Sequence, residues 1–257
     1  MSTVSVAQPG TPGCGTLLGV WAHPDDEAFL SAGLMALARE AGERVVVVTA
    51  TAGEQGAADP ADRGRALGRR RRRELGAALA AVGVREHTVL GLPDGGCAAV
   101  PSGDGAAFVR SSIAAVRPDT IVTFGPDGMT GHDDHRAVHR WVTDAWRQSG
   151  EPGTLLYATL TPAFHARWGQ LNEQVGLWER EPPSTAEADV ALTVDCTAVI
   201  DRKVAALDAH ASQTSALAEA VGHGTLRDWW ATEWFAAAPR LHTAPALATV
   251  APAAVRP

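Results

Sequence analysis

The stretch VWAHPDDEAFLSAG (residues 20–33) places one histidine and three acidic residues within five positions, directly after an apolar run. A single side chain is enough to cap a following helix, because an N-cap accepts from the first free backbone N–H groups. We expect Glu27 to favour the helix start, where the macrodipole stabilises a negative charge. Four polar side chains at the end of an expected buried strand therefore predict a role besides capping.

Short apolar runs alternate with longer helical patterns around this stretch. We predict strands at 16–22, 44–50, 87–92, 119–125, 154–160 and 188–196, and helices at 26–41, 64–82, 105–116, 135–148, 164–174, 199–217 and 226–238. The run RVVVVTA (44–50) is apolar on both faces, as in a buried parallel strand. This alternation predicts right-handed βαβ units, and hence one α/β domain with a Rossmann-like, mostly parallel sheet and helices on both faces.

Length and composition limit the class of protein. The chain has 257 residues, of which 46% are hydrophobic, enough for the core of one large domain. We expect a flexible lead at 1–14, one folded domain at 15–242 and an Ala/Pro-rich tail at 243–257. The net charge of −7 excludes a general basic surface for nucleic acid, and no apolar run approaches the length of a membrane helix. Three scattered cysteines and the lack of a signal-like start favour the cytoplasm.

Three polar clusters follow predicted strands. They are HPDDE (23–27), TAGEQG (51–56) and GPDGMTGHDDHRAVH (125–139). In an open parallel sheet, ligands bind outside the carboxyl ends of the strands, so we expect the clusters to meet there.

A metal ion suits this set of side chains. A catalytic zinc takes three nitrogen or oxygen ligands and keeps a fourth position for water. His23 and Asp26 lie three residues apart, and His132 repeats this spacing with His135. A lone histidine is usually a satisfied structural side chain, but four such groups on two turns at one sheet edge favour a metal site.

Two of these motifs, AHPDDE (22–27) and GHDDH (131–135), resemble the LmbE/PIG-L family of zinc-dependent N-acetylglucosaminyl deacetylases, which includes the deacetylase of mycothiol biosynthesis. The segments TAGEQG, RRREL (71–75), LGLPDGG (90–96) and KVAALDAHASQ (203–213) are weaker matches that agree. The resemblance runs from about residue 16 to about residue 213 and implies the LmbE-like fold.

The resemblance also implies roles for individual residues. It assigns the metal to His23, Asp26 and His135, and the general base to Asp25. His132 would stabilise the oxyanion or protonate the leaving amine, with Asp134 hydrogen-bonded behind it. The positions that touch the sugar in some members are matched by Arg71 and Asp94.

The sequence departs from the family pattern at two positions. The second motif usually reads Gly-His-Pro-Asp-His, whereas Asp133 stands here in place of the proline. Some members carry an oxyanion-binding aromatic side chain near the position of Thr130, which a threonine does not replace in the same way. We expect these changes to affect the choice of substrate and to leave the metal site intact.

The implied function is a metal-dependent hydrolase that removes an N-acetyl or related acyl group from an amino sugar or its conjugate, by attack of a metal-bound water. The alternatives are an amidase that cleaves a mycothiol-type conjugate, and a non-catalytic metal- or sugar-binding protein of the same fold. A phosphohydrolase fits less well, because such His/Asp designs are all-helical. Zinc is the expected cofactor, and Fe²⁺ is another suitable divalent metal. The expected partner is a small-molecule amino sugar, with no nucleic acid and no membrane, and a homo-oligomer stays open.

Two further features have structural explanations. In the run RGRALGRRRRRE (63–74), we interpret most arginines as a solvated helix face and give only Arg71 a functional position. The segment DWWATEWF (228–235) contains aromatic residues that either belong to the core or line a sugar-binding rim, and we favour the core.

Overall fold

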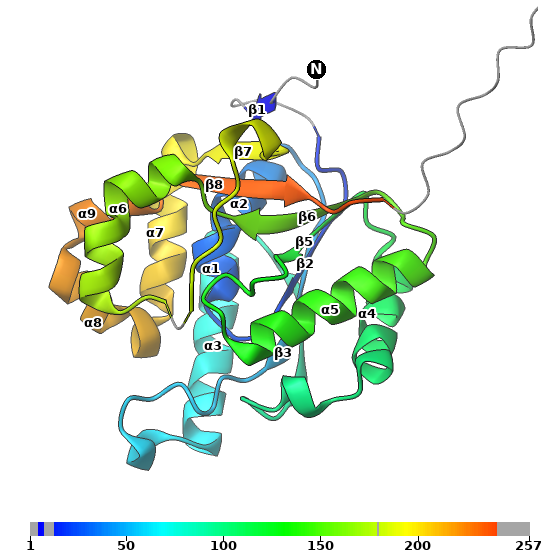
Figure 1. Ribbon diagram of the computed structural model, residues 1–257. Helices are drawn as coiled ribbons and strands as arrows, with labels where there is room; N and C mark the ends of the chain where they lie inside the picture. Colours follow the sequence, from blue (N-terminus) through cyan, green and yellow to red (C-terminus); the bar gives the residue numbers. More distant parts are fainter. Residues whose placement is uncertain (1–4, 8–12, 179, 241–257) are drawn as a thin grey trace, which may run out of the picture.

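A single eight-stranded sheet organises the fold in the computed structural model, which describes residues 5–7, 13–178 and 180–240 (Figure 1). The strand order is β1-β7-β8-β6-β5-β2-β3-β4. β8 runs antiparallel to β6 and β7, and the other neighbours are parallel. The strands are β1 (Ser5–Ala7), β2 (Leu17–Trp21), β3 (Val45–Thr51), β4 (Glu86–Leu92), β5 (Thr120–Phe124), β6 (Thr154–Thr159), β7 (Leu192–Asp195) and β8 (Thr232–Ala237).

Helices form a layer on each side of this sheet. On one side α4 and α5 pack against each other, and on the other side α2, α3 and α7 form the second layer. The helices are α1 (Asp26–Leu30), α2 (Ala32–Glu40), α3 (Arg65–Ala81), α4 (Ser102–Val116), α5 (Asp133–Gln148), α6 (Pro162–Val175), α7 (Ile200–Ala209), α8 (Ala211–Val221) and α9 (His223–Trp229). Short 3₁₀ turns lie at Pro60–Asp62, Cys97–Ala99, Glu187–Asp189 and Thr197–Val199. The expected α/β class, with a mostly parallel sheet covered on both faces, is confirmed.

The centre of the sheet positions the functional residues. β2 pairs with β3 on one side and with β5 on the other, and every residue of these three strands is buried. The chain passes from β2 to β3, and later returns to the opposite side of β2 at β5. Such a reversal opens a crevice at the carboxyl ends of the strands, where ligands bind in this class of fold. The polar clusters that follow β2 and β5 therefore face each other.

The predicted helix at 226–238 is wrong in its second half. α9 ends at Trp229, and β8 enters the sheet between β6 and β7. Along β8, buried Glu233 and Phe235 alternate with half-buried Thr232 and Trp234. This period of two is typical of a strand, but the high alanine and tryptophan content of the segment favoured a helix.

Two predicted helices are each divided in two. The segment 26–41 breaks at Ser31, where φ is −149°, and the segment 199–217 breaks at His210. The carboxylate of Glu233 accepts hydrogen bonds from the backbone N–H groups of Gly33 (2.7 Å) and Leu34 (2.9 Å). It thereby satisfies the first free donors of α2, a task that an N-cap side chain usually performs.

The N-terminal part of the chain differs from the expectation. Ser5–Ala7, placed in the predicted lead, pair in parallel with Leu192–Val194 of β7. The predicted tail at 243–257 lies outside the described residues. Within the described part of the chain, no helix has the length and apolar character needed to cross a membrane.

An ion pair inside the second helix layer links α7 to β8. Lys203 Nζ lies 2.6 Å from Glu233 Oε1 and donates to the carbonyl oxygen of Phe29 (2.9 Å). The exposed fraction of the two charged side chains is 0% and 2%. Removing one partner of such a pair leaves the other charge unpaired in a dry interior.

We predict that Lys203→Met lowers the free energy of unfolding by about 3–5 kcal/mol, because Glu233 loses its buried cation. The double variant Lys203→Met/Glu233→Gln recovers part of this loss, since no unpaired charge remains. Urea unfolding measures both values. The control is Arg44→Met, which breaks the exposed pair with Glu86 and leaves the urea midpoint unchanged. An equal loss in the control contradicts the argument from burial.

Candidate active site

The turn after β2 presents three polar side chains to the crevice. The backbone of Asp25 has φ 116° and ψ −30°, and α1 begins at the next residue. Within this turn the N–H of His23 donates to Asp26 Oδ2 at 2.7 Å. The bond ties the two residues into one rigid unit, with both side chains buried.

The start of α5 supplies the opposing histidines. His132 is the N-cap, and His135 lies in the first turn of the helix. The ring of His135 stacks on Phe124 at the end of β5, with centroids 4.1 Å apart and planes 9° from parallel. Its Nδ1 lies 2.9 Å from the carbonyl oxygen of Gly128, so Nδ1–H donates and Nε2 keeps its lone pair.

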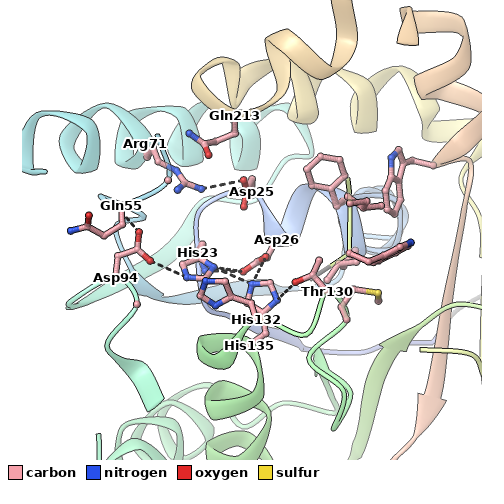
Figure 2. A pocket seen from close by; sticks show the side chains of 18 residues that line it. His23, Asp25, Asp26, Gln55, Arg71, Asp94, Thr130, His132, His135 and Gln213 are labelled. Atoms are coloured by element: carbon pink, nitrogen blue, oxygen red, sulfur yellow. Dashed lines mark hydrogen bonds and ion pairs between the residues drawn. The ribbon is translucent and has the colours of Figure 1, made fainter. Parts of the chain in front are cut away.

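Three side chains of the kind that bind metals converge at the centre of the site (Figure 2). His23 Nδ1 lies 3.0 Å from His135 Nε2, which lies 3.3 Å from Asp26 Oδ1. Asp26 Oδ2 lies 3.7 Å from His23 Nδ1. Ligands that surround a tetrahedral zinc at about 2.0–2.1 Å are about 3.3–3.4 Å apart, so the observed separations suit one shared ion.

The hydrogen bonds behind these atoms direct two lone pairs at each other. His23 Nε2 faces Asp94 Oδ1 at 3.1 Å and Asp134 Oδ2 at 3.4 Å, and as a donor to them it leaves Nδ1 as the acceptor. Nδ1 then confronts the lone pair of His135 Nε2. Two lone pairs at this distance repel each other unless a cation lies between them. The donor set therefore fits a metal ion, or a proton in its place.

The pKa values of the two histidines reflect the same arrangement. Burial lowers the pKa of His23, but the carboxylates of Asp134, Asp94 and Asp26 outweigh it and raise this pKa to about 10. For His135, burial and the charges of His23 and His132 lower the pKa to about 3. Without a metal ion His23 therefore favours its protonated form, while His135 stays neutral and keeps a lone pair on Nε2.

Asp134 does not lie where the resemblance implied. Its carboxylate accepts from the backbone N–H groups of Gly95 (2.8 Å) and Cys97 (2.9 Å) and faces His23, not the ring of His132. Burial raises the pKa of Asp134, and the hydrogen bond with His23 outweighs it, so the pKa lies below its usual value. Asp134 and Asp94 thus form the carboxylate support that a metal-binding histidine commonly has.

His132 has a backbone partner in place of a carboxylate. Its Nδ1 accepts the N–H of Asp134 at 3.1 Å, as an N-cap does. A ring with an acceptor at Nδ1 carries its proton at Nε2, and is therefore a neutral hydrogen-bond donor. The ring is half-buried and lies 4.8 Å from that of His23 and 5.1 Å from that of His135, between centroids.

Arg71 and Asp94, expected to touch the sugar, both bond within the site. Arg71 donates to the carbonyl oxygens of Gly53 (2.8 Å) and Pro24 (2.5 Å), and lies 3.1 Å from Asp25 Oδ2. Asp94 faces His23 and accepts the N–H of Gln55 at 2.7 Å. Burial raises the pKa of Asp25, and the charge of Arg71 opposes this shift. Arg71 and Asp94 also line the cavity beside His23, Asp26 and His135, which we call the metal-type cluster.

A cavity of about 340 Å³ opens onto these groups. Figure 2 shows Asp94, Gln55 and Arg71 on one side of the histidines and Thr130 on the other. The cavity is also lined by residues that the sequence analysis missed or assigned elsewhere, namely Phe29, Leu30, Met129, Leu177, Trp178, Gln213 and Trp230. Gln55 and Gln213 belong to the segments TAGEQG and KVAALDAHASQ. Their position in these motifs was the sequence feature that could have identified them as cavity residues.

Asp133 and Thr130, the two departures from the family pattern, lie in different surroundings. Asp133 is exposed and pairs with Arg180 at 3.1 Å, directed away from the metal-type cluster. Thr130 lines the cavity, with its hydroxyl 3.4 Å from His135 Nδ1.

Comparison with known proteins identifies relatives of this chain. Residues 18–146 match the model of the PIG-L family, described as GlcNAc-PI de-N-acetylase. The 1D-myo-inositol 2-acetamido-2-deoxy-alpha-D-glucopyranoside deacetylase of Acidothermus cellulolyticus is 34% identical over 235 residues, which cover 77% of this chain and 79% of the relative.

Two solved structures share the fold. N,N'-diacetylchitobiose deacetylase from Pyrococcus horikoshii aligns with a TM-score of 0.58 and 20% identity, over 87% of this chain and 84% of its own. The 4-carboxy-2-hydroxymuconate hydratase of Pseudomonas putida aligns with a TM-score of 0.56 and 18% identity, over 89% and 98%. The fold thus occurs with different reactions, and it does not by itself decide the chemistry.

We predict that Asp134→Asn lowers the affinity for Zn²⁺ about 10–100-fold, because His23 loses a carboxylate support. The matched control is Asp133→Asn, which changes the neighbouring residue on the exposed side and leaves the affinity unchanged. Competition with a chromogenic chelator measures both affinities. Equal affinities for the two variants contradict a supporting role for Asp134.

Proposed function

This chain belongs to the PIG-L family of GlcNAc-PI de-N-acetylases, and from that premise we propose that it is a metal-dependent hydrolase that removes the N-acetyl group from an amino sugar conjugate. The observation that carries the proposal is the convergence of His23, Asp26 and His135, with a further carboxylate at Asp25 in the same cavity. A binding protein needs no carboxylate beside the ligand set, so the non-catalytic alternative is not favoured.

His23, Asp26 and His135 would hold the metal. The cluster offers two imidazole nitrogens and one carboxylate, a donor set that suits Zn²⁺ and also Fe²⁺. When bound, the ion supplies a Lewis acid that polarises the amide carbonyl and lowers the pKa of water toward about 7. Asp94 and Asp134 keep Nδ1 of His23 available as a ligand by accepting from Nε2.

Asp25 acts as the general base. It lines the cavity next to Asp26 and is kept from free rotation by Arg71, which lies 3.1 Å from its Oδ2. Asp25 takes a proton from the water that attacks the amide carbon. Burial raises the pKa of this carboxylate and makes it a stronger base than an exposed aspartate.

His132 stabilises the negative charge that develops on the amide oxygen. Its Nδ1 already accepts a backbone N–H, so the neutral ring carries its proton on Nε2, and the ring lines the cavity. Asp25 then returns its proton to the amine nitrogen as the C–N bond breaks, giving acetate and the free amine.

The cavity suggests how the substrate lies. Hydroxyl groups of a sugar match the polar side formed by Gln55, Arg71 and Asp94, and the aromatic residues Trp178 and Trp230 offer apolar faces. The curated relatives are named as deacetylases of a glucosamine linked to inositol. An N-acetylglucosamine conjugate is therefore the substrate class, and the amidase alternative is not favoured.

The place of action remains an expectation from the sequence. Cys14, Cys97 and Cys196 are free thiols in the structure, in keeping with a reducing compartment such as the cytoplasm.

The first experiment measures metal content and amine release from N-acetylglucosamine conjugates with protein purified without chelators. We expect near-stoichiometric metal, and we expect His135→Ala to lose metal and turnover together. Asp25→Asn keeps its metal, and its kcat falls at least about 10²-fold, since only the base is removed. Turnover that survives in metal-free protein contradicts the proposal, as does Asp25→Asn with full activity.

A further inference from the structure

The backbone at Asp25 is held in a conformation that an L-residue rarely adopts. Its φ of 116° lies in the region that favours glycine, and the side chain is an aspartate. Such a residue persists only where its surroundings hold it, and such residues occur often at active sites. The contacts that hold this turn therefore bear on the direction of the Asp25 carboxylate.

Glu27 supplies the main-chain contact. Its Oε2 accepts the backbone N–H of Asp25 at 3.0 Å, so a side chain inside α1 reaches back to the residue that precedes the helix. This resembles the returning arm of a capping box, in which an acidic side chain binds the N-cap N–H. The expectation that Glu27 serves only the helix macrodipole is therefore incomplete.

His210 fixes Glu27 from a distant part of the chain. Its Nε2 lies 2.6 Å from Glu27 Oε1, and the exposed fractions of the two side chains are 0% and 1%. His210 Nδ1 has no hydrogen-bond partner among the described residues. Both side chains are buried, and neither lines the cavity.

A buried ionisable pair is weak evidence for stability, because desolvation offsets its attraction. The second carboxylate oxygen of Glu27 accepts the backbone N–H of Asp25, and Asp25 is the proposed base. On the other side, Arg71 holds the carboxylate of Asp25 and donates to the carbonyl oxygen of Pro24. Asp25 is thus held through its main chain by Glu27 and through its side chain by Arg71.

We propose that Glu27 and His210 are positioning residues, which hold the Asp25 backbone in its left-handed conformation and so aim its carboxylate at the attacking water. The inference rests on the proposed function, because it assumes that Asp25 is the base. The pair acts through orientation alone. Its loss lowers kcat and leaves metal binding and KM unchanged.

The test compares His210→Ala with His210→Gln. Without His210, Glu27 is free to leave Asp25, and we expect kcat to fall about 10²-fold, the usual cost of a displacement of about 1 Å. KM and Zn²⁺ affinity stay within about twofold of the wild type. His210→Gln places an amide N–H at the position of Nε2 and restores most of kcat. The variant Glu27→Met keeps the approximate size of the side chain and removes both acceptors, so the N–H of Asp25 loses its partner and kcat also falls.

A matched control separates positioning from general loosening. Thr214 lies one turn beyond His210 and is buried, and its hydroxyl donates to the carbonyl oxygens of Leu207 (2.7 Å) and His210 (3.1 Å). Thr214→Val lowers Tm at the same helix junction and keeps kcat within about twofold. Crystal structures of the variants give a readout without turnover: in His210→Ala, φ of Asp25 becomes negative or Asp25 Oδ2 leaves Arg71.

Three results overturn the inference. They are an unchanged kcat in both His210→Ala and Glu27→Met, a structure in which φ of Asp25 and its contact with Arg71 are both unchanged, and a loss of Zn²⁺ affinity parallel to the loss of kcat, which assigns the pair to Asp26. If the wild type hydrolyses no N-acetyl amino sugar, the proposed function fails, and the torsion at Asp25 still decides whether Glu27 and His210 hold it.

Discussion

The approach of the His23 and His135 rings to 3.0 Å is the interaction on which the site depends. The two residues are 112 positions apart in the sequence, and they meet because β2 and β5 are neighbouring parallel strands whose carboxyl ends share one edge. Strand register thus sets the distance between the two rings. A local motif supplies the chemistry, and the crossing of the chain at the centre of the sheet assembles it.

Carboxylates surround this pair of rings. Asp26 lies on one side of the histidines, and Asp94 and Asp134 lie behind His23. Such a concentration of negative charge in a buried place is unfavourable without a compensating cation. Arg71 compensates Asp25, and the remaining carboxylates raise the pKa of His23 to about 10, which favours the positively charged form of this one imidazole. The electrostatics of the site therefore favour a cation at the point where the ligand atoms meet.

The sequence predicted the parallel half of the sheet well, because its strands are apolar on both faces and separated by helical patterns. It failed at β8. Glu233 is buried there because it pairs with Lys203, but a glutamate in the sequence does not indicate a buried strand position. The residues predicted for the site lie close together in the structure, but several of their hydrogen-bond partners were not predicted. The direction of Asp134 depends on N–H groups of Gly95 and Cys97 in another loop, and the partner of Glu27 lies 183 residues away. Contacts of this kind depend on tertiary structure and leave no local periodicity.

The place of β8 has a consequence for synthesis on the ribosome. β7 pairs with β1 and β8, and its connection to the rest of the sheet runs through β8 alone. Before residues 232–237 leave the exit tunnel, β2 to β6 already have one another as neighbours, whereas β7 has no link to them and the edge of β6 that pairs with β8 has no partner, which is the kind of edge that other chains can join. The same delay leaves the first turn of α2 without the carboxylate of Glu233. A chaperone that covers the edge of β6 would act during this interval, while the sheet is still incomplete.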